Sequence, residues 1–301
     1  MTIRQVEVFL AVAREKSFSR AATALHLSQP TLSEHVGELE RELAKPLFNR
    51  RGREVTLTEA GRVFEDWATR IATAVEGAHQ AIAELDGLAH GSLLVGASTT
   101  PGLYVLPAVI AAFRARYPGI ELKLQVANSQ VIEVRVRRRE LDLGVIGGHI
   151  LGPGEECVTA GLLDELMLVV AAGHPWARRR AVAPAQLASQ PLLMREEGSA
   201  TRQVTERALQ RAGIKYRVAM ELDHTEAIKQ AVMAGLGVAF VSVHAVRGEV
   251  ATGRLRALRL RGLRIARHFH VIYNEARRLS ASARTFMEAL EKTSQGRVRR
   301  A

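Results

Sequence analysis

The sequence is 301 residues long and carries a formal net charge of +11 and a single cysteine. This length suits two or three compact domains. One cysteine excludes an internal disulfide framework and a thiolate metal cluster, and no run approaches the roughly 20 apolar residues that cross a bilayer. The first 19 residues mix acidic side chains with a helical apolar period, which is not typical of a signal peptide, so we expect a cytoplasmic protein without membrane contact.

The positive charge is distributed unevenly along the chain. Residues 1–90 hold 11 Lys or Arg and 13 Asp or Glu, whereas residues 91–301 hold 31 and 18. Bulk charge therefore does not identify a segment that binds nucleic acid. The arginine excess in the second part either attracts an anionic ligand or reflects a compositional bias, and the sequence alone favours the bias.

The N-terminal 61 residues predict several short elements in close succession. A helix is expected over residues 2–15, followed by two short helices joined by a tight turn, a basic hairpin and a new helix start. Ser19 is predicted to cap the first short helix and Ser28 the second, where Pro30 is tolerated because first-turn amides lack intrahelical partners. An apolar stripe of the second helix should face inward; it comprises Leu32, Val36, Leu39 and Leu43.

The outer face of that second helix and the hairpin after it carry groups suited to DNA. Short polar side chains on a helix can read base edges in the major groove, and cations at a hairpin tip can hold phosphates or enter a minor groove. The candidate DNA-binding residues are Gln29, Pro30, Thr31, Ser33, His35, Arg50, Arg51 and Arg53. The alternative is an ordinary helical hairpin with a solvated basic loop, which the order and spacing of these features disfavour.

A long helix is predicted to begin at Thr58 and to run to about residue 88. Its apolar positions follow spacings of three and four residues and form a heptad-like seam. They are Phe64, Trp67, Ile71, Ala74, Ala78, Ile82 and Leu85. Such a helix either packs on its own domain or pairs with a second copy. Its place between two domains favours a dimer-forming linker.

From residue 92 onward, strand and helix patterns alternate. Strands at 92–98, 120–127 and 141–147, with helices at 101–117 and 129–139, predict a parallel α/β subdomain. A strand at 165–172 crosses into a second subdomain with strands at 192–194, 216–222 and 238–242 and helices at 200–212 and 225–235. The segments 268–274 and 280–292 return to the first subdomain. The predicted domains are 1–58, 59–90 and 91–301, with lobe I at 91–164 and 266–301 and lobe II at 165–265.

A ligand site is expected between these lobes, because ligands of open α/β sheets bind beyond the carboxyl ends of the strands. Helix N-termini, hydroxyl groups and an arginine near those ends would suit an anion. The candidate effector-binding residues are Ser98, Thr99, Thr100, Asn128, Ser129, Gly147, Gly148, Ser199, Thr201, Arg202 and His224. The alternative is structural: the hydroxyl groups and His224 cap helices, and Arg202 pairs with Glu206 across one helical turn.

Residues 9–61 also carry the pattern AA-x-x-LH-x-SQP-T-LS-x-H-x-x-x-LE-x-EL-x-x-x-LF-x-R with a closing LT-x-AG. This pattern resembles the winged helix-turn-helix of LysR-type transcriptional regulators. The resemblance implies a mainly α-helical winged helix-turn-helix, a long linker helix and a two-lobed α/β effector domain like that of periplasmic binding proteins. It further implies three kinds of partner: double-stranded promoter DNA, a second copy in a dimer or tetramer, and RNA polymerase.

Two segments of the effector region narrow the resemblance. The S-T-T after the first strand and the run E-A-I-K-Q-A-V-x-A-G-L-G-V resemble the branch that contains regulators of carbon fixation and sulfur assimilation. Those regulators respond to small, often phosphorylated or sulfur-containing anions. His224 stands where many relatives have Ser or Asn, which leaves the effector open.

We therefore expect a sequence-specific DNA-binding transcriptional regulator that is controlled by a small anionic metabolite. The alternative is a solute-binding protein without a regulatory role, which residues 1–90 and the missing export signal disfavour. An enzyme is not expected, since the sequence has no phosphate-binding glycine loop, metal-ligand spacing or nucleophile elbow. No catalytic residue, metal or cofactor is predicted.

Overall fold

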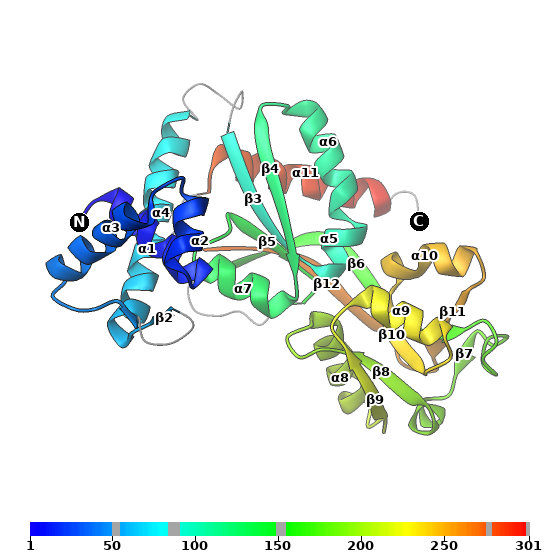
Figure 1. Ribbon diagram of the computed structural model, residues 1–301. Coiled ribbons are helices and arrows are strands. Elements are labelled where there is room, and N and C mark those ends of the chain that lie inside the picture. The colour runs from blue at the N-terminus through cyan, green and yellow to red at the C-terminus, as the bar shows by residue number, and fades with distance from the viewer. Residues whose placement is uncertain (50–54, 84–90, 149–154, 275–278, 299–301) are drawn as a thin grey trace. The chain divides into compact units, whose positions relative to one another are not determined.

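The computed structural model describes residues 1–49, 55–83, 91–148, 155–274 and 279–298. Contacts divide the chain into two compact units. Unit 1 comprises Met1–Leu85 with Arg138–Glu140, and unit 2 comprises Asp86–Arg137 and Leu141–Ala301. Figure 1 labels most of the elements of both units. No helix in the described segments is long and apolar enough to cross a membrane.

Unit 1 consists of three short helices, a two-stranded ribbon and one long helix. They are α1 (Ile3–Glu15), α2 (Phe18–Ala24), α3 (Gln29–Glu42), β1 (Phe48–Asn49), β2 (Thr56–Leu57) and α4 (Glu59–Ala83). Phe9 is the centre of the core: its ring meets that of Phe64 edge-on at 4.8 Å and that of Phe48 at 5.1 Å. These aromatic contacts pack α1, the ribbon and the start of α4 against one another.

The helix caps of unit 1 agree with the sequence in one case and differ in another. Ser28 caps α3 through its Oγ, which accepts from the Thr31 amide at 3.3 Å. The prediction for α2 was wrong: Ser17 is its cap and accepts from the Arg20 amide, while Ser19 lies inside the helix. Ser17 occupies the cap position because α2 begins at Phe18, about one turn before Ala21 and Ala22, the apolar residues that indicated the helix in the sequence.

The apolar stripe of α3 is shorter than expected. Leu32, Val36 and Leu39 are fully buried, as predicted. Leu43 is 37% exposed because α3 ends at Glu42 and Leu43 is its C-cap. Leu43, the last residue of the predicted stripe, therefore lies beyond the end of α3 and is not buried in the core.

Lobe I of unit 2 begins at Gly91, directly after the predicted linker 59–90. Its elements are β3 (Gly91–Ser98), α5 (Thr99–Tyr104), α6 (Leu106–Arg116), β4 (Ile120–Ala127), α7 (Ser129–Arg137), β5 (Leu143–Ile146) and α11 (Ala281–Val298). β3 pairs in parallel with both β4 and β5, as the alternating pattern predicted. The single helix expected over 101–117 is two helices, because Pro107 lacks the amide that would continue the hydrogen bonds of α5 into α6.

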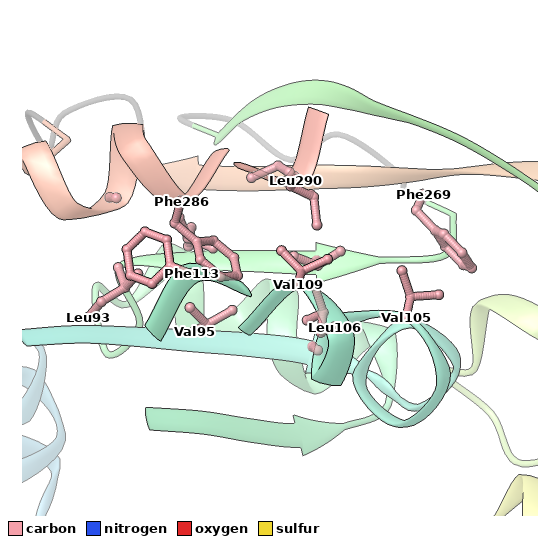
Figure 2. Close-up of a cluster of buried hydrophobic side chains, with 14 of the residues drawn as sticks. Leu93, Val95, Val105, Leu106, Val109, Phe113, Phe269, Phe286 and Leu290 are labelled. Carbon is pink, nitrogen blue, oxygen red and sulfur yellow. The ribbon is translucent and has the colours of Figure 1, made fainter. Parts of the chain in front are cut away.

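The core of lobe I lies between its sheet and the helices α6 and α11. Figure 2 shows the side chains of this cluster, in which Phe113 of α6 meets Phe286 of α11 at a centroid distance of 5.3 Å. A second cluster on the other face includes Ile132 and Val136 of α7. Both faces of the sheet are therefore covered, which fixes the carboxyl ends of its strands.

Two long antiparallel strands connect the lobes. They are β6 (Glu155–Ala171) and β12 (Ile265–Asn274), and both are longer than the sequence predicted. Their register pairs Arg267 with Asp164 and shifts between His268 and His270. Both strands include charged residues near these positions, so the apolar pattern in the sequence begins later than the strands do.

Lobe II uses the far halves of these strands together with its own elements. These are β7 (Ala181–Val182), a 3-10 helix (Pro184–Ser189), β8 (Pro191–Arg195), α8 (Ala200–Arg211), β9 (Arg217–Leu222), α9 (Thr225–Met233), β10 (Val238–Ser242), α10 (Val243–Ala251) and β11 (Leu255–Leu260). Every residue of β10 is buried, since α8 covers one face of the sheet and α9 and α10 cover the other. The sequence did not predict β7, β11, α10 or the 3-10 helix.

Candidate functional site

The exposed face of α3 carries the polar residues that the sequence selected for DNA. Gln29, Pro30 and Thr31 are exposed in the first turn, and Ser33 and His35 are half-buried further along. Gln29 is positioned from α2, because its Oε1 accepts from Ser19 Oγ at 3.0 Å. The helix thus presents its N-terminal end outward while its apolar stripe holds it against the core.

The basic tip of the hairpin, with Arg50, Arg51 and Arg53, lies outside the described residues. The base of that hairpin is described. Phe48 pairs with Leu57 and Asn49 with Thr56 in antiparallel register. Glu40 of α3 accepts from the amides of Leu47 and Phe48, which ties the hairpin to α3.

The second candidate region lies in unit 2, where β12 passes from one lobe to the other. Arg267 is almost completely buried there. Its Nε donates to Asp164 Oδ2 at 2.9 Å, its Nη1 to Thr201 Oγ1 at 3.0 Å and its Nη2 to Thr100 Oγ1 at 3.1 Å. Burial lowers the pKa of Arg267, and the Asp164 carboxylate opposes that shift. One guanidinium therefore joins lobe I, lobe II and the crossing strands.

A second buried arginine lies beside the first. Arg195 ends β8, and its Nη1 donates to Thr225 Oγ1 at 2.8 Å while its Nη2 donates to Thr99 Oγ1 at 3.3 Å. Its Nε pairs with Glu196 at 2.7 Å. We call these residues the arginine hub: Thr99, Thr100, Asp164, Arg195, Thr201 and Arg267. The free space at the hub is about 10 Å³, which holds one water molecule at most.

Glycine is required next to the hub. A Cβ on Gly147 would lie 2.8 Å from Arg267 Cζ, so a side chain there would collide with the guanidinium. The Gly147 amide also donates to Ser98 Oγ at 3.2 Å. Gly147 was selected in the sequence to let backbone approach a ligand, and in the structure the group that approaches it is Arg267.

The remaining candidates divide between structural contacts and a larger cavity. Asn128 caps α7, since its Oδ1 accepts from the Val131 amide at 3.0 Å. Arg202 pairs with Glu206 at 2.9 Å and also with Glu221. Burial lowers the pKa of Arg202, but the hydrogen bonds to these two glutamates and their negative charges together outweigh burial and raise it overall. His224 is exposed at the start of α9, where its side chain makes no cap bond.

The larger cavity has a volume of about 420 Å³ and opens beside the hub between α7 and the start of α8. Of the sequence candidates, it is lined by Ser129, Gly148, Ser199 and Arg202. Glu133, Glu197 and Glu206 also line it. Three carboxylates against one arginine make this cavity less suited to an anion than the hub.

Sequence reasoning missed both hub arginines. Arg195 follows the buried run 192–194 and lies at the carboxyl end of its strand, so the rule that selected Ser98 and Asn128 would also have selected it. Arg267 falls one residue before the strand predicted at 268–274. A charged residue at the edge of an apolar strand was the available signal.

Both units match known protein families. Residues 3–62 match the family described as bacterial regulatory helix-turn-helix protein, lysR family, and residues 86–295 match the family described as LysR substrate binding domain. The chain belongs to the LysR family of transcriptional regulators. It is accordingly a DNA-binding regulator with an effector-binding domain and not an enzyme.

The relatives of this LysR regulator confirm the fold and the branch. The RuBisCO operon transcriptional regulator of Allochromatium vinosum is 37% identical and covers 96% of this chain and 95% of its own. Full-length OxyR of Pseudomonas aeruginosa is 24% identical with a TM-score of 0.73, and the match covers 98% and 95% of the two chains. The regulatory domain of CcmR from Synechocystis, solved in complex with 2-PG, is 29% identical with a TM-score of 0.64 over 68% of this chain and 98% of that one.

Proposed function

We propose that this LysR regulator responds to a small organic anion that binds at the arginine hub between the two lobes. The observation that carries the proposal is the convergence of two buried guanidiniums, Arg195 and Arg267, on neutral threonine hydroxyls. An anionic oxygen accepts a hydrogen bond from a guanidinium more strongly than a hydroxyl does. A carboxylate or phosphate can therefore replace the threonines as the acceptor.

The charges around the hub determine what kind of anion suits it. Asp164 pairs with Arg267 and Glu196 pairs with Arg195. A ligand must compete with these carboxylates, which favours a group with several acceptor oxygens. The acidic residues of the adjacent cavity oppose an anion that extends into that cavity, so a compact anion is favoured over a long one. The 2-PG bound by the CcmR domain is an anionic metabolite of this kind.

The hub has no room for such a ligand while its threonines are in place, so binding requires the lobes to separate and close again around the anion. The bonds from Arg267 to Thr100 and Thr201 would then be exchanged for bonds to the ligand. A ligand can shift the protein between two arrangements only through its differential affinity for them. We infer that this shift changes the spacing of DNA-reading heads in a dimer or tetramer, and thereby promoter bending and contact with RNA polymerase.

Calorimetric titration of the full-length protein tests the ligand proposal. The probes are 2-PG and inorganic phosphate, and the variants are Arg195→Met and Arg207→Met. Arg207 is an exposed arginine of α8 and does not contact the hub, so it controls for net charge. We expect the wild type and R207M to bind 2-PG alike and R195M to bind at least about tenfold more weakly.

Two outcomes would contradict the proposal. Equal affinity of R195M and the wild type, with R195M folded by circular dichroism, would remove the hub from the site. Equal affinity for 2-PG and inorganic phosphate would remove the organic part of the ligand. Footprinting with and without 2-PG then tests control of DNA binding, and an unchanged footprint at saturating 2-PG would exclude 2-PG as the controlling metabolite.

A further inference from the structure

Lobe II carries most of the net charge of the whole chain. Residues 165–265 hold 16 Lys or Arg and 8 Asp or Glu, and the two segments of lobe I, 91–164 and 266–301, together hold 15 and 10. Basic residues are about equally frequent in both lobes, so composition alone does not single out a surface. What distinguishes lobe II is where its arginines lie.

Much of the excess lies at one corner of the lobe II sheet. Main-chain bonds bring two segments together there: the Arg259 amide donates to Arg180 O at 3.2 Å, and the Arg261 amide donates to Val182 O at 2.9 Å. We call this the arginine corner, and its six exposed members are Arg178, Arg179, Arg180, Arg259, Arg261 and Arg264. Within the described segments, the carboxylate that pairs with this corner is Glu165, at 3.3 Å from Arg259 and 3.5 Å from Arg264.

The corner also has a projecting turn. Leu260 and Leu263 form an isolated bridge, and Gly262 between them has φ +73°, a conformation that glycine adopts without strain. The bridge closes a tight turn with Arg261 near its tip and Arg264 at its base. Both leucines face inward or are half-buried, so the turn presents guanidiniums to solvent and little apolar surface.

The composition of the corner favours one class of partner. A protein interface normally has an apolar centre surrounded by a polar rim. Among the described residues, the exposed large apolar side chains all lie outside 172–190 and 250–265. Arginines without an apolar centre suit a polyanion whose phosphates repeat along its length, and the planar guanidinium binds phosphate in a bidentate manner. We propose that the arginine corner binds the phosphate backbone of double-stranded DNA, in addition to the DNA-reading head of unit 1.

Salt dependence of DNA binding by the full-length protein tests the proposal. The corner variant is R178Q/R179Q/R180Q/R261Q, which leaves the Glu165 pairs with Arg259 and Arg264 intact. The control variant, R207Q/R211Q/K215Q/R217Q, removes four exposed charges from another part of lobe II. Random-sequence duplexes of about 15 and about 60 base pairs are titrated over a range of NaCl concentrations. The slope of log K against log salt changes by about 0.9 for each phosphate contact.

We expect the corner variant to lose about two to three units of slope on the long duplex, while the control variant keeps the wild-type slope. A loss on the long duplex alone assigns the contact to DNA that flanks the head on the same molecule. A loss on both lengths assigns it to independent duplex binding. An equal loss in the corner and control variants would overturn the proposal in favour of bulk charge. An unchanged slope with corner-dependent binding of poly-glutamate would overturn it in favour of an acidic protein.

Discussion

Arg267 connects elements that lie far apart in the sequence. Its partners Thr100 and Asp164 are 167 and 103 residues away along the chain, and Gly147 supplies the space in which its guanidinium lies. A buried charge is tolerated only when it is paired and fully hydrogen-bonded. The position of this side chain is therefore determined by every element around it. Small changes nearby should measurably lower the free energy of unfolding.

The substitution Gly147→Ala should displace the guanidinium. Its Cβ would lie 2.8 Å from Arg267 Cζ, and overpacking in a buried site costs about 1–3 kcal/mol. We expect the free energy of unfolding in urea to fall by that amount. Gly173→Ala is the matched control, because no atom lies within 4 Å of a Cβ at that position. An effect of equal size in both variants would contradict the packing argument.

Lys229 makes a second buried charge contact in lobe II. Its Nζ donates to Glu249 Oε1 and to Ala245 O, each at 2.9 Å, and pairs with Glu226 at 2.6 Å. Burial raises the pKa of Glu249, but the hydrogen bond from Lys229, a backbone hydrogen bond and the charges of Lys229 and Arg254 together outweigh burial and lower it overall. A lowered carboxyl pKa contributes stability that is present at neutral pH and is lost as the pH falls through that pKa.

Glu249→Gln should therefore have a pH-dependent cost. Removing one partner of a buried pair costs on the order of 1–3 kcal/mol at pH 7.5. The difference from the wild type should shrink at a pH below 4.5, the ordinary value for a carboxyl, and disappear as the pH falls through the lowered pKa of Glu249. Urea unfolding at both pH values measures this, with Glu121→Gln at an exposed pair as control. A difference in the free energy of unfolding that grows on acidification would contradict the lowered pKa of Glu249.

At the scale of elements, α3 depends on its cap as much as on its apolar stripe. The Ser28 hydroxyl is the side-chain acceptor for the Thr31 amide, and it also contacts the Thr31 hydroxyl at 2.8 Å. The cap thus fixes both the start of α3 and a residue that we expect to read bases. In the effector domain, Pro107 has a comparable effect by separating α5 from α6, which leaves α5 to carry Thr99 and Thr100.

Ser28→Ala should destabilise the first unit and weaken operator binding. Loss of a serine N-cap costs about 1 kcal/mol, which should appear as a lower melting temperature. Ser28→Asp keeps an acceptor at the cap and should restore most of the stability. If S28A and S28D melted alike and both differed from the wild type, the cap would not be the cause.

At the scale of the molecule, α4 has an apolar stripe that its own unit does not cover. Val63, Trp67 and Ile82 are 61%, 57% and 66% exposed. The first two line a groove of about 930 Å³ together with Leu43 and Met1. Large exposed apolar surfaces on a soluble protein mark interaction sites. The dimer expected from the heptad-like seam would cover this surface with a second copy of α4.

Trp67→Glu should weaken that dimer. A buried tryptophan is typically a dominant contact of an interface, so its loss should raise the dimer dissociation constant at least about tenfold. Sedimentation velocity at micromolar concentration measures the change. Asp66→Asn, at the neighbouring exposed position of α4, is the control. A dimer unaffected by W67E would place the subunit contact elsewhere.

The DNA-reading head and the alternation of strands and helices could be predicted from sequence because their causes are local. A cap and its amide are three residues apart, and the apolar period of a helix or strand is visible in a short window. The exceptions follow the same reasoning. Ser17 replaced Ser19, and Leu43 left its stripe, because the ends of a helix depend on neighbours that the window does not include.

The hub could only be recognised in the tertiary structure. Thr99, Thr100 and Thr201 resemble ordinary residues at helix starts, and the sequence selected them without knowing their partners. Arg195 and Arg267 were not selected, because each lies at the end of a strand pattern and its threonine partners are far away along the chain. Their pairing depends on two lobes meeting across long strands, and interactions between residues 96 or 167 positions apart leave no periodic signal in the chain.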